Sequence, residues 1–383
     1  MTFPSMGRGT PLRIGIAGAR RGVRFLAGLQ SAGTVQVTAV YDPSPEAREA
    51  FRRETGVEHI CESYSQLLEQ SDAVIISSPQ QYHVPQAVHA LQAGIHVLSE
   101  VPAAVSMEQA QELLGAVRRS SALYMLAENY CYTRPNLIVK SMVQAGMFGD
   151  IYFAEGEYLH EMKSWHQHTD GQPTWRYFWQ VGRDGHTYPT HSLGPVLQWL
   201  QDRLVSVSCV GTGRHTDPEH TIQDTVLLLG RTSRGALVKV RFDLLSNRPH
   251  LMDYYSLQGT GGAYEAARAA GEQERVYLQG ASPDGAWEAL EQYADRFLPD
   301  KYRHVAAGAG HWGSDTWPVR EFVEAIARAR TPPLDIYAAL DMTLPGIISE
   351  HSIAQGGAWL AVPDPRYMTA GIGADPGKEA PRL

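Results

Sequence analysis

This sequence contains few cysteines, and it lacks both an excess of basic residues and long apolar runs. It has three cysteines among 383 residues, Cys61, Cys131 and Cys209. An odd number of widely spaced cysteines argues against a disulfide framework and predicts free thiols in a reducing cytoplasm. The formal net charge of −8 provides no basic surface for nucleic acid or for an anionic membrane. No apolar run approaches a membrane span, and residues 1–11 lack the apolar core of an export signal.

What the sequence contains is typical of a globular protein. Hydrophobic residues make up 43% and charged residues 19% of a chain long enough for two domains. We find no internal repeat, and we expect a cytoplasmic location with neither nucleic acid nor membrane as a partner. The strand pattern changes near residue 130. We therefore predict one domain over 1–130, a second over 131–363, and a disordered tail rich in Gly, Pro and Ala over 364–383.

A strand, a glycine turn, a helix and a second strand are predicted at the start of the chain. The apolar run Leu12–Ala17 predicts a buried parallel strand, Gly18–Gly22 predicts the turn, and Val35–Tyr41 predicts the second strand. In such a unit, the backbone N–H groups of the turn and the helix N-terminus can bind a pyrophosphate. Asp42 follows the second strand, where a carboxylate can accept both ribose hydroxyls and would repel a 2′-phosphate. The segment therefore predicts NAD rather than NADP.

The glycine spacing departs from the usual G-x-G-x-x-G pattern. Arg20 stands where the second glycine is expected, and Gly22 comes one residue early. Arg20 and Arg21 are either surface charges or neighbours of the phosphates, and the sequence leaves both interpretations open. An ordinary βαβ unit with a tight turn is the alternative to a dinucleotide site.

Strands and helices continue to alternate as far as residue 129. Helices are predicted at 43–55, 63–70, 82–93 and 106–120, and strands at 72–77, 95–99 and 122–127. This alternation is typical of an α/β fold with a doubly wound parallel sheet, the Rossmann arrangement. The carboxyl ends of its strands are expected to line one crevice, at Gly18, Asp42, Ser77, Glu100 and Glu128.

Beyond residue 130, strands follow one another without helices between them. A helix is predicted at 135–145, and strands at 151–160, 204–213, 225–229, 236–245 and 254–259. The pattern predicts an α+β domain with a large, mainly antiparallel open sheet. Late helices are predicted at 315–330 and 335–354, and the second is a candidate for packing back on the first domain. Because the helices suffice for only one face of the sheet, we expect a homodimer or homotetramer that uses the other.

Motifs in the first domain resemble those of the Gfo/Idh/MocA oxidoreductases. The strand ending Ser77-Ser78-Pro79, with His83 four residues after Pro79, is followed by AGIHVLSEVPAAVSMEQAQEL. The resemblance extends over residues 12–363 and implies a Rossmann domain that binds NAD. Two residues of ordinary family dehydrogenases are replaced, because the family's Glu-Lys-Pro is Glu100-Val101-Pro102 here and Thr187 stands where an Asp precedes His191 by four residues. These losses argue against alcohol dehydrogenation by the usual machinery.

Other motifs resemble one branch of this family, the NAD-dependent α-N-acetylgalactosaminidases. They are EVPAA from Glu100, Glu128-Asn129, EGEYLHE around Tyr158, Trp175-Arg176, YPTHSLGP from Tyr188, and His311-x-Gly313-x-Asp315. The resemblance implies redox elimination. A hydride passes from C3 of the sugar to NAD, a base removes the C2 proton, the anomeric group leaves, water adds and the hydride returns.

That route requires a base near C2–H and C3–OH and an acid for the leaving group. Tyr188 and His191 are three residues apart, which would place them on one face of a helical turn with Pro189 at its start. We predict that they form the catalytic acid/base pair, with Tyr158 as a second phenol candidate. The alternative for each is a packed, hydrogen-bonded core side chain.

The remaining site predictions concern cofactor and substrate contacts. The predicted NAD contacts are Gly18, Ala19, Arg20, Arg21, Gly22, Asp42, Ser77, Ser78, Pro79, His83, Glu100, Val101, Glu128 and Asn129. Trp175 could stack on a sugar and Arg176 could bind a substrate oxygen, so both join Tyr188 and His191 as predicted substrate contacts. The alternative is a loop pinned by aromatic residues. We predict no metal, although His166 and His168 belong to a histidine-rich loop.

Taken as a sequence, the chain predicts an NAD(H)-dependent oxidoreductase that acts on a sugar or glycoside by hydride transfer at a ring carbon. Two alternatives stay open. One is an NAD-dependent glycoside hydrolase that works by redox elimination. The other is a non-catalytic NAD- or sugar-binding protein, which the loss of the family's lysine and aspartate favours.

Overall fold

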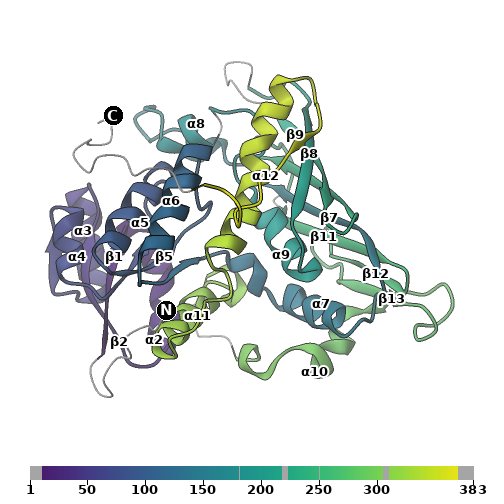
Figure 1. The fold of residues 1–383 in the computed structure, drawn as a ribbon, viewed down its shortest axis with the longest axis horizontal. Coiled ribbons are helices and arrows are strands. Elements are labelled where there is room, and N and C mark those ends of the chain that lie inside the picture. Colours follow the sequence, from purple (N-terminus) through teal and green to yellow (C-terminus); the bar gives the residue numbers. More distant parts are fainter. Residues whose placement is uncertain (1–10, 181, 218–222, 250, 305–309, 370–383) are drawn as a thin grey trace. The chain divides into compact units, whose positions relative to one another are not determined.

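The computed structural model describes residues 11–369, apart from 181, 218–222, 250 and 305–309 (Figure 1). The chain folds into two compact units. Unit 1 consists of the described residues of Met1–Ala127, Val319–Leu340 and Asp364–Leu383, and unit 2 consists of those of Glu128–Pro318 and Asp341–Pro363. The chain therefore passes from unit 1 to unit 2 at Ala127 and returns twice, a pattern that local periodicity does not reveal.

Unit 1 is built on a six-stranded parallel sheet with the order β3-β2-β1-β4-β5-β6. Its strands are β1 (Leu12–Ala17), β2 (Val35–Tyr41), β3 (His59–Cys61), β4 (Ala73–Ile76), β5 (His96–Ser99) and β6 (Tyr124–Leu126). The apolar runs form strands because both faces are covered, and Ile14, Ile16 and Ile75 have no exposed surface. The strand order reverses direction between β1 and β4, where such sheets bind their ligands. The predicted α/β Rossmann fold is confirmed.

Three helices of unit 1 begin at serine caps that the sequence provides. The helices of this unit are α1 (Ala19–Gly22), η1 (Val23–Phe25), α2 (Leu26–Ser31), α3 (Pro45–Thr55), α4 (Tyr64–Glu69), η2 (Gln80–Tyr82), α5 (His83–Gln92) and α6 (Met107–Arg119), with parts of α11 (Thr316–Ala327) and α12 (Ile336–Ala354). The Ser44 hydroxyl accepts a hydrogen bond from the Ala47 N–H, and Ser63 forms a capping box with Gln66. The first predicted helix is divided into three short pieces, α1, η1 and α2, rather than one continuous amphipathic helix.

The start of the predicted tail has defined contacts. The Arg118 guanidinium of α6 donates hydrogen bonds to the carbonyls of Pro365, Arg366 and Met368 at 2.8–3.1 Å. Residues 364–369 are thus held against unit 1, in contrast to the disorder that composition predicts. The rest of the predicted tail, residues 370–383, lies outside the described part of the chain.

Unit 2 is built on a nine-stranded mixed sheet with the order β14-β13-β12-β11-β7-β10-β9-β8-β15. Its strands are β7 (Ile151–Leu159), β8 (Leu204–Gly211), β9 (Thr225–Thr232), β10 (Leu237–Asp243), β11 (Leu251–Gly259), β12 (Gly262–Glu265), β13 (Arg275–Leu278), β14 (Glu288–Ala289) and β15 (Leu360–Ala361). All pairs are antiparallel except β7 with β10. The predicted large, mainly antiparallel sheet is confirmed, although β12 to β15, with two to four residues each, are too short to be found from the sequence.

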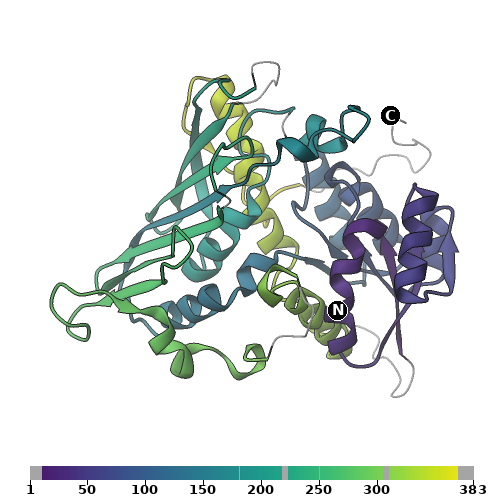
Figure 2. The same cartoon turned by 180° about the vertical axis from the view of Figure 1, so that it is seen from behind.

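Helices cover one face of this sheet. Unit 2 contains η3 (Asn129–Tyr132), α7 (Arg134–Gln144), η4 (Lys163–Trp165), α8 (Trp175–Trp179), α9 (Thr190–Leu200), η5 (Leu290–Tyr293), α10 (Ala294–Phe297), η6 (Asp300–Tyr302) and η7 (His311–Gly313), with parts of α11 (Thr316–Ala327) and α12 (Ile336–Ala354). Helices α7 and α9 lie on the same side of the strands in both views (Figures 1 and 2). A Cβ on Gly156 of β7 would lie 2.2 Å from the Ser192 carbonyl oxygen of α9, so this glycine allows the helix to pack directly on the strand.

The three cysteines, Cys61, Cys131 and Cys209, are buried free thiols. Burial raises the pKa of Cys209 to about 12, which keeps this thiol protonated. Among the residues that the structure describes, no helix is long and apolar enough to cross a membrane.

Candidate active site

The glycine turn of unit 1 is built for close backbone approach. Gly18 has φ +93°, and a Cβ there would lie 2.5 Å from the backbone carbonyl carbon and oxygen of Ser77 at the end of β4. A Cβ on Gly22 would lie 2.3 Å from the Ile16 side chain of β1. The first glycine therefore permits the turn and the last permits α1 to pack on the sheet, which are two of the three roles of glycine in dinucleotide-binding turns.

Asp42 connects the turn to the second strand. One oxygen of its carboxylate accepts a hydrogen bond from the Ala19 N–H at 2.9 Å, and the other accepts one from the Ser44 N–H at 3.0 Å. The Ser77 hydroxyl is 2.9 Å from the carbonyls of Ala17 and Gly18. An acid beside a glycine turn at the carboxyl ends of β1 and β2 fits the adenosine ribose and pyrophosphate of NAD. These residues thus fit the cofactor that the sequence predicts.

Asp42 gives a prediction about cofactor choice. Asp42→Ala should weaken NAD binding by about 1.5–3 kcal/mol, about 10–150-fold, because a charged acceptor of the ribose hydroxyls is lost. Asp42→Ser with a nearby arginine added should shift the preference toward NADP. Titration calorimetry with both nucleotides measures this, and Asp42→Asn is the control that keeps one oxygen acceptor for the turn. A wild-type protein that already prefers NADP would contradict the assignment.

The other predicted NAD contacts of unit 1 are held in place by one another. Arg21 forms an ion pair with Glu100 at 2.5 Å, and Glu100 also accepts a hydrogen bond from the Val101 N–H at 3.2 Å. Arg20 is exposed. The buried His83 ring lies 2.9 Å from the Ser78 carbonyl and 3.0 Å from the Pro102 carbonyl, and burial lowers the pKa of His83. A neutral imidazole donates to only one of these two carbonyls, so His83 is hydrogen-bonded to one of the two loops and packs against the other. His83 remains a predicted NAD contact.

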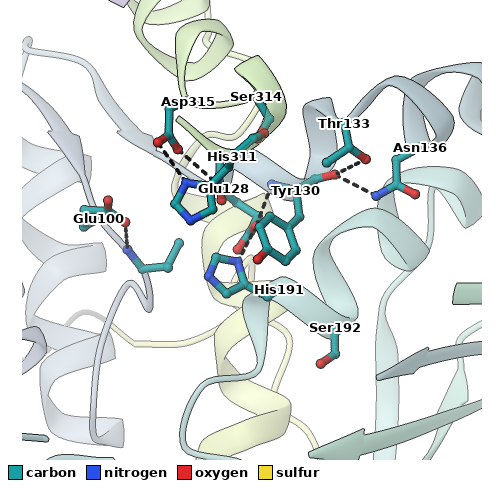
Figure 3. A network of polar contacts seen from close by, with 12 residues as sticks. Glu100, Glu128, Tyr130, Thr133, Asn136, His191, Ser192, His311, Ser314 and Asp315 are labelled. Atoms are coloured by element: carbon teal, nitrogen blue, oxygen red, sulfur yellow. Dashed lines mark hydrogen bonds and ion pairs between the residues drawn. The ribbon is translucent and has the colours of Figure 1, made fainter. Parts of the chain in front are cut away.

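Unit 2 brings Glu128 and His191 together. The Glu128 carboxylate is fully buried, and its Oε1 lies 2.8 Å from His191 Nδ1 and accepts a hydrogen bond from the Tyr130 N–H at 3.0 Å (Figure 3). A carboxylate at Nδ1 favours the tautomer with its proton there and leaves Nε2 for proton transfer. A Cβ on Gly194 would lie 2.9 Å from the Glu128 side chain, so this glycine makes room for the pair. Glu128, predicted as a cofactor contact, is here the partner of the predicted catalytic histidine.

Three phenols surround the His191 ring. Its centroid lies 4.2 Å from that of Tyr130, 5.2 Å from that of Tyr158 and 4.8 Å from that of Tyr188. The predicted proximity of Tyr188 to His191 is confirmed, but the predicted helical geometry is wrong. Helix α9 begins at Thr190, with Pro189 in the N-cap position, so Tyr188 precedes the helix. Sequence reasoning missed Tyr130, although its position just after the end of β6 could have indicated it.

A second carboxylate lies beside a second histidine in unit 2. His311 Nδ1 lies 2.9 Å from Asp315 Oδ2, and the Asn129 side-chain amide donates to Asp315 Oδ1 at 2.8 Å (Figure 3). Asp315 is buried, and the His311 ring lies 6.1 Å from that of Tyr130. Asn129, predicted as a cofactor contact, thus holds this aspartate. The sequence offered His311 and Asp315 only as a family motif.

Asp253 is a further acid that sequence reasoning missed. It lies in β11, two residues before Tyr255, whose hydroxyl donates to the His191 carbonyl at 2.5 Å. Burial raises the pKa of Asp253 to about 6, while the nearby imidazoles of His191 and His311 lower it and the Glu274 carboxylate raises it. Nothing in the sequence around Asp253 distinguishes it from an ordinary strand residue.

The raised pKa of Asp253 makes stability depend on pH. In the folded protein the Asp253 carboxyl keeps its proton up to about pH 6, whereas in the unfolded chain it releases the proton near pH 4. The contribution of Asp253 to the free energy of unfolding therefore falls as the pH rises from 4 to 6. Asp253→Asn should therefore stabilise the protein by about 1–3 kcal/mol above pH 6 and have little effect below pH 4. Thermal unfolding at pH 4 and pH 7.5 measures the difference. Asp284→Asn, at an exposed loop position, is the control, and equal effects of Asp253→Asn at both pH values would contradict the prediction.

The loop that carries the predicted substrate contacts Trp175 and Arg176 is stabilised by aromatic rings. The Arg176 guanidinium of α8 lies 4.4 Å from the Trp175 ring and 5.3 Å from the Trp165 ring, and it donates to Gln180 Oε1 at 2.8 Å. The Thr187 hydroxyl donates to the Gln180 carbonyl at 2.9 Å. Thr187 therefore belongs to the support of this loop, and Trp175 and Arg176 remain predicted substrate contacts.

Two family models match the chain along its length. Residues 12–128 match the oxidoreductase family with an NAD-binding Rossmann fold, and residues 132–369 match the C-terminal domain of glycosyl hydrolase 109. The chain belongs to the glycosyl hydrolase 109 family. The predicted NAD-binding Rossmann domain and the predicted resemblance to the galactosaminidase branch of the Gfo/Idh/MocA enzymes are confirmed. Val101, which stands where the resemblance to ordinary family dehydrogenases implies a lysine, is buried.

Relatives and solved structures agree with this membership. A glycosyl hydrolase family 109 protein of Stenotrophomonas maltophilia is 27% identical, with 96% of this chain and 91% of the relative covered. An oxidoreductase domain protein from Kribbella flavida has the same fold with a TM-score of 0.80 at 19% identity, over 93% of this chain and 100% of that one. A levoglucosan dehydrogenase in complex with NADH and L-sorbose has a TM-score of 0.78 at 18% identity, over 93% and 100% of the chains. At these identities the two structures support the fold.

Proposed function

We propose that this member of glycosyl hydrolase family 109 acts on a sugar or glycoside by hydride transfer at a ring carbon, and that the hydride returns so that a glycoside is cleaved without net oxidation. The observation that carries the proposal is the Glu128–His191 pair packed against Tyr130, Tyr158 and Tyr188. A buried carboxylate that orients an imidazole among phenols is suited to proton transfer at adjacent hydroxyl and C–H groups. Neither the lysine nor the aspartate of ordinary dehydrogenases is needed for this arrangement.

Each residue of the cluster has a distinct role in the proposed reaction. Glu128 holds His191 with Nδ1 protonated and stabilises the imidazolium when Nε2 takes a proton. Tyr188, half-buried beside His191, exchanges a proton with the sugar hydroxyl that is oxidised. Tyr158 lies within 5.8 Å of Tyr188, ring to ring, and is the alternative phenol. When bound through Asp42 and the Gly18–Gly22 turn, NAD supplies the hydride acceptor and donor.

The test of this function is exchange at C2 of the sugar. Sugars and N-acetyl sugars are incubated with the protein and NAD in deuterated water, and 4-nitrophenyl N-acetyl-α-galactosaminide serves as the first glycoside. The proposal expects deuterium at C2 and aglycone release with no net NADH. Accumulation of NADH with a polyol would instead favour a simple dehydrogenase. Tight NAD binding with neither exchange nor cleavage across the panel would favour a non-catalytic binding protein.

We further propose a homodimer or homotetramer in the cytoplasm. The buried free thiols support a reducing compartment, and the charge of −8 supports a small-molecule substrate rather than nucleic acid. The support for assembly is the outer face of the unit 2 sheet, where Leu227 and Leu229 of β9 and Leu237 of β10 are only partly buried. Lys239 and Arg241 of β10 stand opposite Leu229 and Leu227, so this face mixes apolar and charged side chains. Such a composition is typical of a protein–protein interface.

The assembly proposal predicts a change of mass. Leu227→Asp with Leu229→Asp should weaken self-association by about 10²-fold or more, about 2.7 kcal/mol, because two carboxylates would be desolvated at the interface. Light scattering at micromolar concentration should show a dimer or tetramer for the wild type and a monomer for the variant. Tyr367→Asp, at an apolar position that is 88% exposed, is the control. A monomeric wild type would contradict the proposal.

A further inference from the structure

Tyr130 contacts both members of the Glu128–His191 pair. Its backbone N–H donates to Glu128 Oε1 at 3.0 Å, and its ring stacks on the His191 imidazole with centroids 4.2 Å apart and planes 21° from parallel. Figure 3 shows the phenol ring beside the imidazole. Because Glu128 Oε1 lies 2.8 Å from Nδ1, the imidazole is held at its edge by the carboxylate and on one face by Tyr130.

The contact of Tyr130 with His191 differs from those of the other two phenols. The Tyr158 ring is tilted by 37° at 5.2 Å, and the Tyr188 ring makes a T-shaped contact at 82° and 4.8 Å. Of these three rings, Tyr130 is the one whose face lies along the imidazole. The face of an aromatic ring carries partial negative charge and attracts a cation, more strongly where water is excluded.

The ring of Tyr130, rather than its hydroxyl, is the part that acts on His191. Tyr130 is 0% exposed, and its hydroxyl has no hydrogen-bond partner among the residues that the structure describes. A buried hydroxyl without a partner costs stability rather than adding to it. The residue is fixed through its backbone, because its carbonyl accepts a hydrogen bond from the buried Asn136 amide of α7 at 2.8 Å (Figure 3).

We propose that Tyr130 is a positioning residue for the proton transfer at His191, whose ring fixes the plane of the imidazole and stabilises the cation that forms there. This inference rests on the proposed function. When Nε2 takes the proton from C2 of the sugar, the C–H electron pair stays on the sugar beside the C3 ketone, and the imidazole becomes a cation. The Glu128 carboxylate faces that cation at its edge, and the Tyr130 ring faces it from one side.

Fluorination of the ring at position 130 tests this charge effect while the shape stays nearly constant. Tyr130→Phe keeps the ring, so exchange at C2 of free N-acetylgalactosamine in deuterated water should stay within ~3-fold of the wild type. The same substitution with one, two and three ring fluorines withdraws negative charge from the face step by step. The kcat of exchange should then fall in steps, by about 5–30-fold in total, as expected for a desolvated cation–π contact, with KM and NAD affinity unchanged.

An NMR signal reports the stack without relying on activity. In protein made with isotopically labelled histidine, His191→Gln identifies the Cε1–H signal of His191. The Tyr130 ring shields protons that lie over its face. This signal should therefore move downfield in Tyr130→Leu, which removes the ring, and stay in place in Tyr130→Phe.

Tyr264→Leu is the matched control for Tyr130→Leu. Tyr264 also belongs to unit 2, is 0% exposed, and has a hydroxyl without a hydrogen-bond partner in the described part of the chain. Its ring lies against Trp199, at 5.7 Å, rather than against an imidazole. Tyr264→Leu should therefore leave C2 exchange unchanged, whereas Tyr130→Leu should lower its kcat by about 5–30-fold.

The outcomes separate this inference from simple packing and from the proposed function. Equal kcat across the fluorinated series, an equal loss in Tyr264→Leu, or an unmoved His191 signal in Tyr130→Leu would each overturn the proposal. If Tyr130→Leu does not fold, the fluorinated series decides, because its members keep the ring. If the wild type shows no C2 exchange, the proposed function fails and this inference with it; if the wild type exchanges and the fluorinated series is flat, only this inference fails.

Discussion

Tyr188→Phe should lower turnover by about 10²–10⁴-fold while leaving the fold and NAD binding intact, because only one hydroxyl is removed. The Tyr188 and His191 ring centroids are 4.8 Å apart, and Glu128 holds the imidazole at 2.8 Å. If the phenol and the imidazole transfer protons together, His191→Ala should cost a similar factor. The double variant should cost little more than the worse single one, since residues that act as a unit are not additive. Steady-state rates on the glycoside panel give these factors.

The controls for this prediction test whether loss of any partly buried phenol would have the same effect. Tyr64→Phe removes a hydroxyl that donates to the Gln86 carbonyl at 3.0 Å in unit 1, and it should leave turnover unchanged. Val101→Lys, which restores the dehydrogenase residue, should rescue neither variant, because a cation near the nicotinamide disfavours NAD⁺. Normal turnover of Tyr188→Phe would show that this phenol only packs, and Tyr158 would become the leading base.

Gly18→Ala should be the most damaging single-methyl substitution in unit 1. The alanine would have to adopt φ +93° at about 1–2 kcal/mol, and its Cβ would meet the Ser77 backbone at 2.5 Å. Overpacking against backbone adds about 1–3 kcal/mol, which lowers the melting temperature by ~10 °C in a domain of this size. Because the turn must move to relieve the contact, NAD affinity should fall by about 10²-fold, about 2.7 kcal/mol.

Gly33→Ala provides the matched control for Gly18→Ala. Gly33 has φ +97°, almost the same conformation, but a Cβ there would meet nothing within 4 Å. It should therefore show the conformational cost alone, with normal NAD affinity. Differential scanning calorimetry and NAD titration of both variants isolate the effect of the close contact. Equal stability and equal affinity of the two variants would show that the turn is not constrained by Ser77.

Much of the fold was predictable because its elements have local signals. The strands β1, β4 and β5 are apolar runs that are largely buried on both faces, and β2 is rich in β-branched residues. Ser44, Ser63 and Ser106 mark helix starts by their capping side chains. Short elements carry too few residues for a periodic signal. The three-residue β3 and the strands β12 to β15 were missed for this reason, since their pairing partners define them.

The candidate site was predictable only where its residues lie at strand ends or in motifs. Glu128 and Asn129 follow β6, so the sequence could identify them as site residues, but it could not tell which partner each would have. Their partners, His191 and Asp315, lie 63 and 186 residues away along the chain. Asp253 had no local signal at all, because its raised pKa comes from burial.

By itself, the sequence determined the NAD-binding Rossmann unit and the second sheet domain. It also predicted the NAD preference at Asp42 and the acid/base pairing of Tyr188 with His191. These predictions follow from hydrophobic periodicity, from turn-forming residues and from the short spacing of residues within motifs, all of which are local properties of the chain. Only the tertiary structure decided that Tyr188 precedes helix α9 and that Glu128 orients His191. It also decided that Asp315 and His311 form a second carboxylate–imidazole pair beside Tyr130, in which Asn129 donates to the carboxylate. The physical reason is that the orientation of a buried carboxylate is set by the partners that compensate its desolvation, and those partners come from distant segments that only folding brings together.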